Sequence, residues 1–213
     1  MESIMPPDKL PELYRLPLAF YPDLPSMSIS KVPTATLLPT DSNARQLGIV
    51  THELLQWICD HHPSTDENLP WSLVINQLKQ LGLDKTEQDK AYEMLRQQIA
   101  SLFQDPIGQW LIQPHTEEKN EYELLVGEQG TVSTRIIDRT FITQECRWII
   151  DFKTGSEQME AKKHHQQQVN EYARLLAELS SQPIKCGLYY LTSGHWIQWD
   201  YVSPLAISSA ESK

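Results

Sequence analysis

Hydrophobic residues in the first half of the chain recur at the spacing of amphipathic helices. Between Asp41 and Asp60, an apolar stripe predicts one helix; its members are Leu47, Val50, Leu54, Leu55 and Ile58. The same spacing predicts a second helix from Trp71 to Leu81, which ends before Gly82. A third helix should begin after Asp84 and end near Phe103, because Pro106 cannot continue it.

The second half of the chain has the shorter apolar runs that are typical of strands. Turn residues at Gly127–Gly130, Thr143–Cys146 and Thr192–His195 separate these runs. The predicted strands are Tyr122–Val126, Val132–Phe141, Arg147–Phe152, Cys186–Leu191 and Trp196–Val202, with one long helix at Met159–Ser180. An order of helices, three strands, one helix and two strands predicts an α/β domain whose mixed sheet has a helix packed on it.

The two ends of the chain differ from this pattern. Residues 1–40 hold eight of the 14 prolines, which predicts an extended proline-rich arm or linker, and residues 206–213 are expected to be a flexible tail. The domain is therefore expected at 41–205, with a helical part at 41–118 and a sheet core at 119–205.

Composition excludes several classes of protein. The 213 residues carry a net charge of −10, which opposes non-specific binding to nucleic acid. No apolar run approaches a membrane span, and three scattered cysteines argue against a disulfide framework, which together favour a cytoplasmic protein. The sequence contains no phosphate-binding GxxxxGK[ST] motif, so no ATP site is expected, and it has too few cysteines for an iron–sulfur cluster.

Candidate chemistry lies in two similar segments, TRIIDR and RWIIDFK, which contain Asp138 and Asp151. If these segments form a hairpin that turns at Gln144–Glu145, the two aspartates face each other, and strand alternation places Lys153 beside Asp151. Two such carboxylates suit Mg²⁺ or Mn²⁺, and a neighbouring lysine can stabilise charge on a phosphate. A cross-strand salt-bridge set is the alternative interpretation.

The order of several motifs resembles the RecB-like nuclease branch of the PD-(D/E)XK superfamily. The residues that carry it are Gly48-Ile-Val-Thr-His52, Glu121 or Glu123, Asp138, Asp151-Phe-Lys153, Gln168…Tyr172 and GLYYL, over roughly Asp41 to Val202. The chain looks most like the nuclease domain of bacterial helicase-nucleases of the AddA or UvrD/Rep type. This resemblance implies a restriction-endonuclease-like sheet flanked by helices, with an added N-terminal helical region.

The resemblance also implies roles for individual residues. His52, Asp138, Asp151 and the carbonyl of Phe152 would bind Mg²⁺ or Mn²⁺, with Asp138, Asp151 and Lys153 as the catalytic residues. Gln168 and Tyr172, four residues apart on one helix face, would lie near the DNA backbone. Glu121 and Glu123 remain alternative active-site carboxylates, or both are solvated strand residues.

The function expected from these features is a metal-dependent deoxyribonuclease. It would be the exonuclease domain of a helicase-nuclease in DNA repair or recombination, with DNA and a helicase motor as partners and no contact with a membrane. A catalytically silent DNA-binding or assembly module of a helicase complex is the rival hypothesis, and the retention of His52, Asp138, Asp151 and Lys153 speaks against it.

Overall fold

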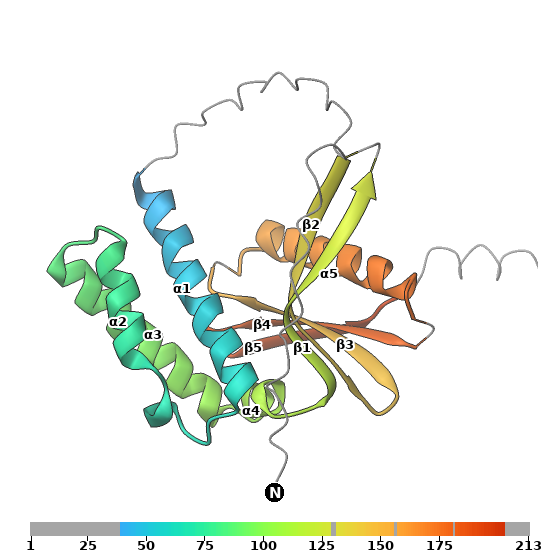
Figure 1. The fold of residues 1–213 in the computed structure, drawn as a ribbon, viewed down its shortest axis with the longest axis horizontal. Coiled ribbons are helices and arrows are strands. Elements are labelled where there is room, and N and C mark those ends of the chain that lie inside the picture. Colours follow the sequence, from blue (N-terminus) through green and yellow to red (C-terminus); the bar gives the residue numbers. More distant parts are fainter. Residues whose placement is uncertain (1–38, 129–130, 156, 181, 203–213) are drawn as a thin grey trace, which may run out of the picture. The chain divides into compact units, whose positions relative to one another are not determined.

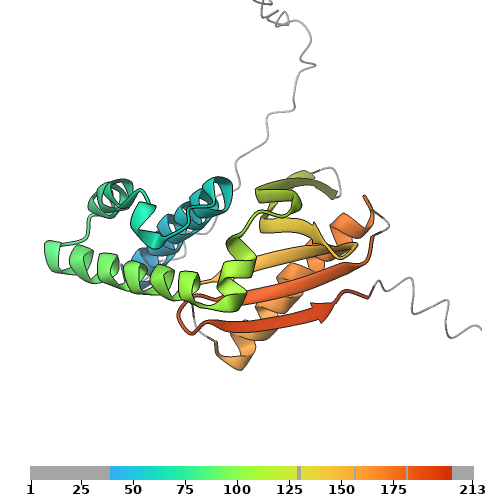
Figure 2. The same cartoon turned by 90° about the horizontal axis from the view of Figure 1, so that it is seen from below.

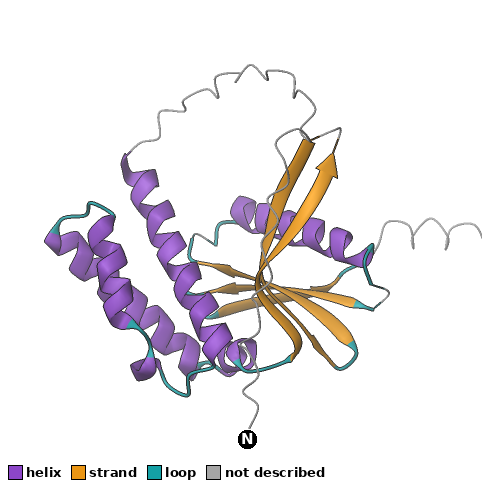
Figure 3. Cartoon of the chain, in the orientation of Figure 1, coloured by secondary structure: helices purple, strands orange, loops and turns teal. Residues whose placement is uncertain are grey.

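A computed structural model of the chain describes residues 39–128, 131–155, 157–180 and 182–202. Four helices precede a five-stranded sheet, and a fifth helix crosses between its third and fourth strands (Figures 1 and 3). The helices are α1 (Pro39–His61), α2 (Trp71–Gln80), α3 (Lys85–Gln104), α4 (Pro106–Ile112) and α5 (Met159–Ala177), with a 3₁₀ turn at Asp66–Asn68. The strands are β1 (Thr116–Glu128), β2 (Thr131–Thr143), β3 (Cys146–Lys153), β4 (Ile184–Tyr190) and β5 (His195–Asp200).

The sheet is mixed, and its strands lie side by side in chain order. Among the strands of the described residues, only β3 and β4 pair in parallel, and α5 is the crossover that connects them. One face of the sheet packs against α5, and the opposite face packs against the N-terminal helices (Figure 2). This arrangement confirms the expected α/β class, with a mixed sheet flanked by helices and an added N-terminal helical region.

The two buried faces explain the apolar run of β3. Trp148, Ile150 and Phe152 face the N-terminal helices, whereas Ile149 faces α5. A strand that is covered on both sides has an unbroken hydrophobic run rather than strict alternation. Asp151 lies within this run, and only 2% of its surface is exposed. The fold therefore holds one carboxylate of the predicted pair inside the protein.

The N-terminal helices begin and end close to the predicted positions, but the sequence interpretation missed one of them. Asp84 caps α3 through a reciprocal pair of hydrogen bonds with Glu87. Pro106 ends α3 as expected, yet it is also the first residue of α4, where a missing N–H costs no helical hydrogen bond. The Asp105 side chain caps this short helix by accepting a hydrogen bond from the Gly108 backbone at 3.0 Å.

The predicted hairpin register between β2 and β3 is confirmed over five residue pairs, from Thr143–Cys146 to Arg139–Ile150. Strands β1 and β2 are 13 residues each; β1 begins six residues before the predicted Tyr122, whereas β2 extends the predicted range by only three residues. Their far ends pair with each other and project away from the rest of the sheet (Figure 1). Leu124 and Ile137 of this region pack with α5, whereas Leu125 and Ile136 are exposed.

The alternation of β2 shifts by one residue along its length. Ile137 packs with the α5 side, while Phe141 packs with the side of the N-terminal helices, although the two have the same parity. The shift falls around Asp138, between the part of β2 paired with β1 alone and the part paired with β3. Asp138 therefore lies at the point where the odd-numbered residues of β2 switch from the α5 side of the sheet to the side of the N-terminal helices.

Some expectations fall outside the described residues. The proline-rich arm, apart from its last two residues, and the tail at 206–213 belong to this group. Within the described ranges, none of the helices combines the length and the apolar character that crossing a bilayer requires.

Candidate metal centre

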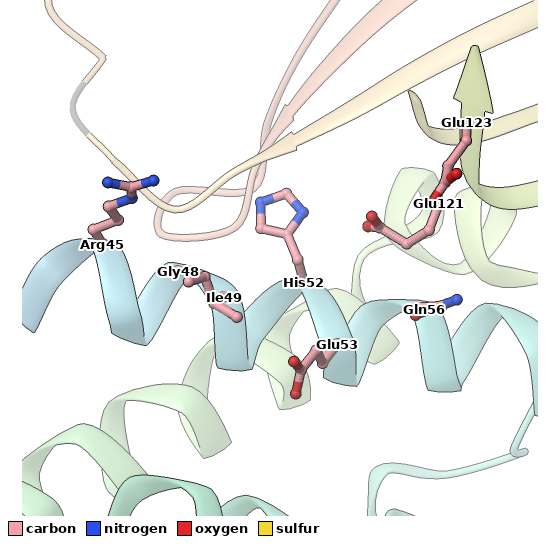
Figure 4. A pocket seen from close by; sticks show the side chains of 8 residues that line it. All are labelled: Arg45, Gly48, Ile49, His52, Glu53, Gln56, Glu121 and Glu123. Atoms are coloured by element: carbon pink, nitrogen blue, oxygen red, sulfur yellow. The ribbon is translucent and has the colours of Figure 1, made fainter. Parts of the chain in front are cut away.

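Three side chains from three different elements meet at one edge of the sheet. His52 comes from the middle of α1, Glu121 from β1 and Asp138 from β2. Each offers one ligand atom, and these atoms lie within 4.8 Å of one another. Figure 4 shows the His52 ring and the Glu121 carboxylate pointing into the space between α1 and β1. The tertiary fold thus gathers one imidazole and two carboxylates that are distant in the sequence.

The Asp138 carboxylate bridges α1 and β3. Its Oδ2 atom lies 3.4 Å from Nδ1 of His52 and accepts a hydrogen bond from the backbone N–H of Phe152 at 2.7 Å. The expected register places Asp138 opposite Asp151; the observed β2–β3 pairs run to Arg139–Ile150, one position before these two aspartates. The bond to the Phe152 N–H fixes the orientation of one Asp138 oxygen.

Asp151 and Lys153 begin a second chain of contacts, which runs toward α5. Lys153 Nζ lies 2.7 Å from Asp151 Oδ2 and donates a hydrogen bond to Gln168 Oε1 at 3.1 Å. Gln168 Nε2 in turn donates to the Tyr172 hydroxyl at 2.7 Å. Gln168 and Tyr172 therefore reach the predicted catalytic lysine, although they lie on the opposite side of the sheet from α1.

Burial shifts the pKa values of the acidic groups at this site upward. Removal from water raises the pKa of Asp138 to about 7, despite the Phe152 N–H, which favours the ionised form. Burial, and then the charge of Asp138, raises the pKa of Asp151 to about 7. Burial also raises the pKa of Glu121, and it lowers the pKa of His52. Without a cation, the site therefore disfavours its own negative charge.

These groups fit a divalent cation. The Oδ2 atom of Asp151 is buried and is paired with the Lys153 ammonium group at 2.7 Å. Several converging carboxylates are costly unless a positive charge compensates them. Carboxylate oxygens with one imidazole nitrogen suit Mg²⁺ or Mn²⁺, of which imidazole favours Mn²⁺. The donor set and its electrostatics therefore match the metal chemistry that the sequence suggests.

The geometry separates Glu121 from Glu123, which the sequence could not. Both line a pocket of about 660 Å³ along α1, together with Arg45, Ile49, Glu53 and Gln56. Glu121 belongs to the group around His52, whereas Glu123 is exposed and lies outside that group. A positive φ of 45° at Glu121 marks a local change of the β1 backbone at this position.

Sequence reasoning missed one residue that stands out in the structure. Arg139, directly after Asp138, is completely buried, and its guanidinium contacts three acceptors. The available signal was a charged residue inside the apolar segment IIDRTF, because an arginine in a buried strand needs partners. Those partners lie 19 to 26 residues earlier in the chain, so the sequence pattern does not identify them.

Comparison with known proteins identifies the family to which this sequence and fold belong. The sequence profile described as "PD-(D/E)XK nuclease superfamily" matches residues 27–201, well over half of the chain. The five-stranded mixed sheet with flanking helices is consistent with the restriction-endonuclease-like core expected from the sequence.

Comparisons with individual proteins give less information about this chain than the family profile does. No curated protein matches the chain. Among solved structures, one titled "Crystal structure of SSO0001" is similar, with 13% identity and a TM-score of 0.30, and the match covers 58% of this chain and 66% of that chain. The match spans slightly less than two thirds of the other chain, and a similarity of this size carries no argument about function.

Proposed function

Because the chain belongs to the PD-(D/E)XK nuclease superfamily, we propose that it is a deoxyribonuclease that hydrolyses phosphodiester bonds with Mg²⁺ or Mn²⁺. The observation that carries this proposal is the convergence of His52, Glu121 and Asp138 beside the Asp151–Lys153 pair. A divalent cation would be held by His52, Asp138 and Asp151, with Glu121 and the carbonyl of Phe152 as further candidate ligands. When bound, it would polarise the phosphate and lower the pKa of an attacking water.

The remaining residues have roles that their contacts support. Lys153 would stabilise the negative charge that develops on the phosphate, because its ammonium group lies beside the carboxylate pair. Gln168 accepts a hydrogen bond from Lys153 and is itself held by Tyr172, so it would orient the lysine. Gln168 and Tyr172 would also lie close to the DNA backbone.

The cellular setting is the finer part of the proposal. The order of motifs around Asp138, Asp151 and Lys153 supports an exonuclease domain of a RecB-like helicase-nuclease in DNA repair or recombination, acting in the cytoplasm. A net charge of −10 makes the chain a poor binder of DNA by itself, which favours a helicase motor that delivers the strand. The motor would supply ATP hydrolysis, because this sequence lacks a phosphate-binding loop.

The rival hypothesis is a catalytically silent DNA-binding or assembly module with the same fold. It requires neither a bound cation nor a reactive lysine. The buried Asp151 carboxylate and the Lys153–Gln168–Tyr172 contacts favour the enzyme, because a silent module gains nothing from the cost of burying a charge there.

The test is cleavage of linear and circular DNA with Mg²⁺, Mn²⁺ or EDTA, alongside Mn²⁺ titration by calorimetry. Lys153→Ala should lower the cleavage rate by about 10²–10³ while Mn²⁺ binding and the melting curve stay close to wild type. Asp151→Asn should reduce both Mn²⁺ binding and cleavage. Wild-type-like cleavage by Lys153→Ala, or Mn²⁺ binding unaffected by Asp151→Asn, would contradict the proposal.

A further inference from the structure

A network of buried polar contacts lies behind the candidate metal centre, and Arg139 is at its middle. Arg139 Nη1 donates a hydrogen bond to Asn120 Oδ1 at 2.6 Å. Its Nη2 donates to the Gln113 carbonyl and to Glu118 Oε2, both at 2.8 Å. The guanidinium therefore connects the end of α4 to two residues of β1. A planar group with several fixed donors suits this branching geometry, which a lysine cannot reproduce.

The part of β1 that Arg139 contacts has an irregular backbone. The pairing of β1 with β2 shifts between Thr116 and Lys119, and Glu117 and Glu121 have φ values of 49° and 45°. Glutamate rarely adopts this left-handed conformation, and it persists only where the surrounding structure imposes it. Glu118 and Asn120, the two side chains that Arg139 binds, lie between these two strained residues.

The same network reaches α1. Glu118 Oε1 lies 2.8 Å from Nε2 of His62, the residue that directly follows α1. The other ring nitrogen of His62 lies 3.0 Å from the Ile112 carbonyl at the end of α4. Through Glu118, Arg139 therefore joins β2 and β1 to the end of α1. These are the three elements that carry Asp138, Glu121 and His52.

We infer that Arg139 is a positioning residue for the metal centre, which holds the irregular β1 segment so that Glu121 points at His52 and Asp138. This inference rests on the proposed function, because it assumes that Glu121 helps to bind the cation. Arg139 acts through Asn120, the residue directly before Glu121. Its side chain is completely buried, and its guanidinium donates to Asn120, Gln113 and Glu118 rather than to the candidate ligands.

A double-mutant cycle tests this role, with Mn²⁺ affinity measured by calorimetry below the melting temperature of every variant. Arg139→Lys keeps the charge but loses the branched contacts, and we expect it to weaken Mn²⁺ binding about 10- to 100-fold, as supporting residues of metal sites do. In the Glu121→Gln background, the same change should alter the affinity less than about twofold, because the group that Arg139 positions no longer carries a ligand charge.

Two further variants make the test specific. Asn120→Ala removes the contact next to Glu121 and leaves the buried arginine in place, so it tests the inference even if Arg139→Lys fails to fold. It should weaken Mn²⁺ binding and show the same dependence on Glu121. Arg147→Lys is the matched control, since Arg147 contacts Glu117 at 2.6 Å at the start of the same segment. Its Mn²⁺ affinity should stay within about twofold of wild type.

The outcomes separate this inference from the proposed function. If the wild-type chain binds no Mn²⁺, both are overturned. If wild type binds Mn²⁺ but Arg139→Lys and Asn120→Ala lower only the melting temperature, Arg139 is purely structural and the inference alone is wrong. Equal losses of affinity with and without Glu121, or equal losses in Arg139→Lys and Arg147→Lys, would also overturn it.

Discussion

At the scale of single residues, the site is dominated by carboxyl groups that burial keeps from ionising freely. Loss of water contact is the main reason why the pKa values of Asp138 and Asp151 each rise to about 7. Lys153 and the Phe152 N–H offset only part of this cost. The chain therefore tolerates a locally unfavourable arrangement, which is common where residues serve a function rather than stability.

This arrangement predicts how the metal-free protein responds to pH. In the unfolded chain an aspartate releases its proton near pH 3.8, whereas Asp138 and Asp151 keep theirs in the folded state until about pH 7. The folded state thus binds more protons between these limits, so the free energy of unfolding should fall as pH rises from about 4 to about 7. His52 acts in the opposite direction, because burial lowers its pKa.

Comparison of variants isolates the contribution of the aspartates. Denaturant unfolding in EDTA at several pH values should show a smaller loss of stability with rising pH in Asp151→Asn than in wild type. Glu93→Gln, at an exposed position of α3, should behave like wild type. Apparent Mn²⁺ affinity should weaken below about pH 7, because protons then compete for the carboxylates. Identical pH profiles for wild type and Asp151→Asn would contradict this account.

At the scale of elements, the strands at the centre of the sheet hold the site in place by close packing. The parallel pair β3–β4 aligns Lys153 with Tyr190, and β5 covers the outer edge of β4. Trp196 of β5 lies over Gly187 of β4, and its ring also packs against Trp110 and Trp148. The glycine is needed because the indole occupies the space that a side chain would fill.

Gly187→Ala should therefore destabilise the fold. A Cβ atom at this position would lie 2.0 Å from the Trp196 ring, which its aromatic neighbours hold in place. Overpacking of this kind typically costs about 1–3 kcal/mol. Gly155→Ala is the matched control, because a Cβ atom there would meet no atom within 4 Å. Thermal unfolding should show a lower melting temperature for Gly187→Ala alone, and equal melting temperatures would refute the packing argument.

At the scale of the whole molecule, the candidate site favours binding of DNA, whereas the net charge of the chain opposes it. The candidate centre suits a phosphodiester substrate, yet the chain carries a net charge of −10, which repels the phosphate backbone. An enzyme of this kind gains from a partner that raises the local concentration of DNA. This conflict is the physical reason for proposing delivery by a helicase motor.

The consequence is a difference between the isolated chain and a fused form. Attachment of a sequence-independent DNA-binding domain through a flexible linker should lower the KM for DNA at least about tenfold, because binding to the second module becomes intramolecular. The kcat should change little, since the residues of the candidate centre stay the same. Steady-state kinetics of both forms at one salt concentration checks this, and equal KM values would show that delivery does not limit the isolated chain.

The sequence alone determined the fold class, the β2–β3 register and the order of all the main elements except the short helix α4. Periodic apolar residues, the cap at Asp84, the stop at Pro106 and the turn at Gln144–Glu145 are local signals that packing reinforces. The helix α4 was missed because a seven-residue helix is too short to show a period. The first part of β1, residues 116–121, was missed because these residues are all polar and show no apolar alternation.

The arrangement of residues around the candidate site could be predicted only in part from the sequence. Strand alternation placed Lys153 beside Asp151, which the structure shows, because that relation involves one strand only. The position of Glu121 beside His52 and Asp138, the hydrogen bond from Lys153 to Gln168 and the contacts of Arg139 were decided by tertiary structure. Each depends on a local backbone irregularity or on elements distant in the chain, and periodicity carries no information about either.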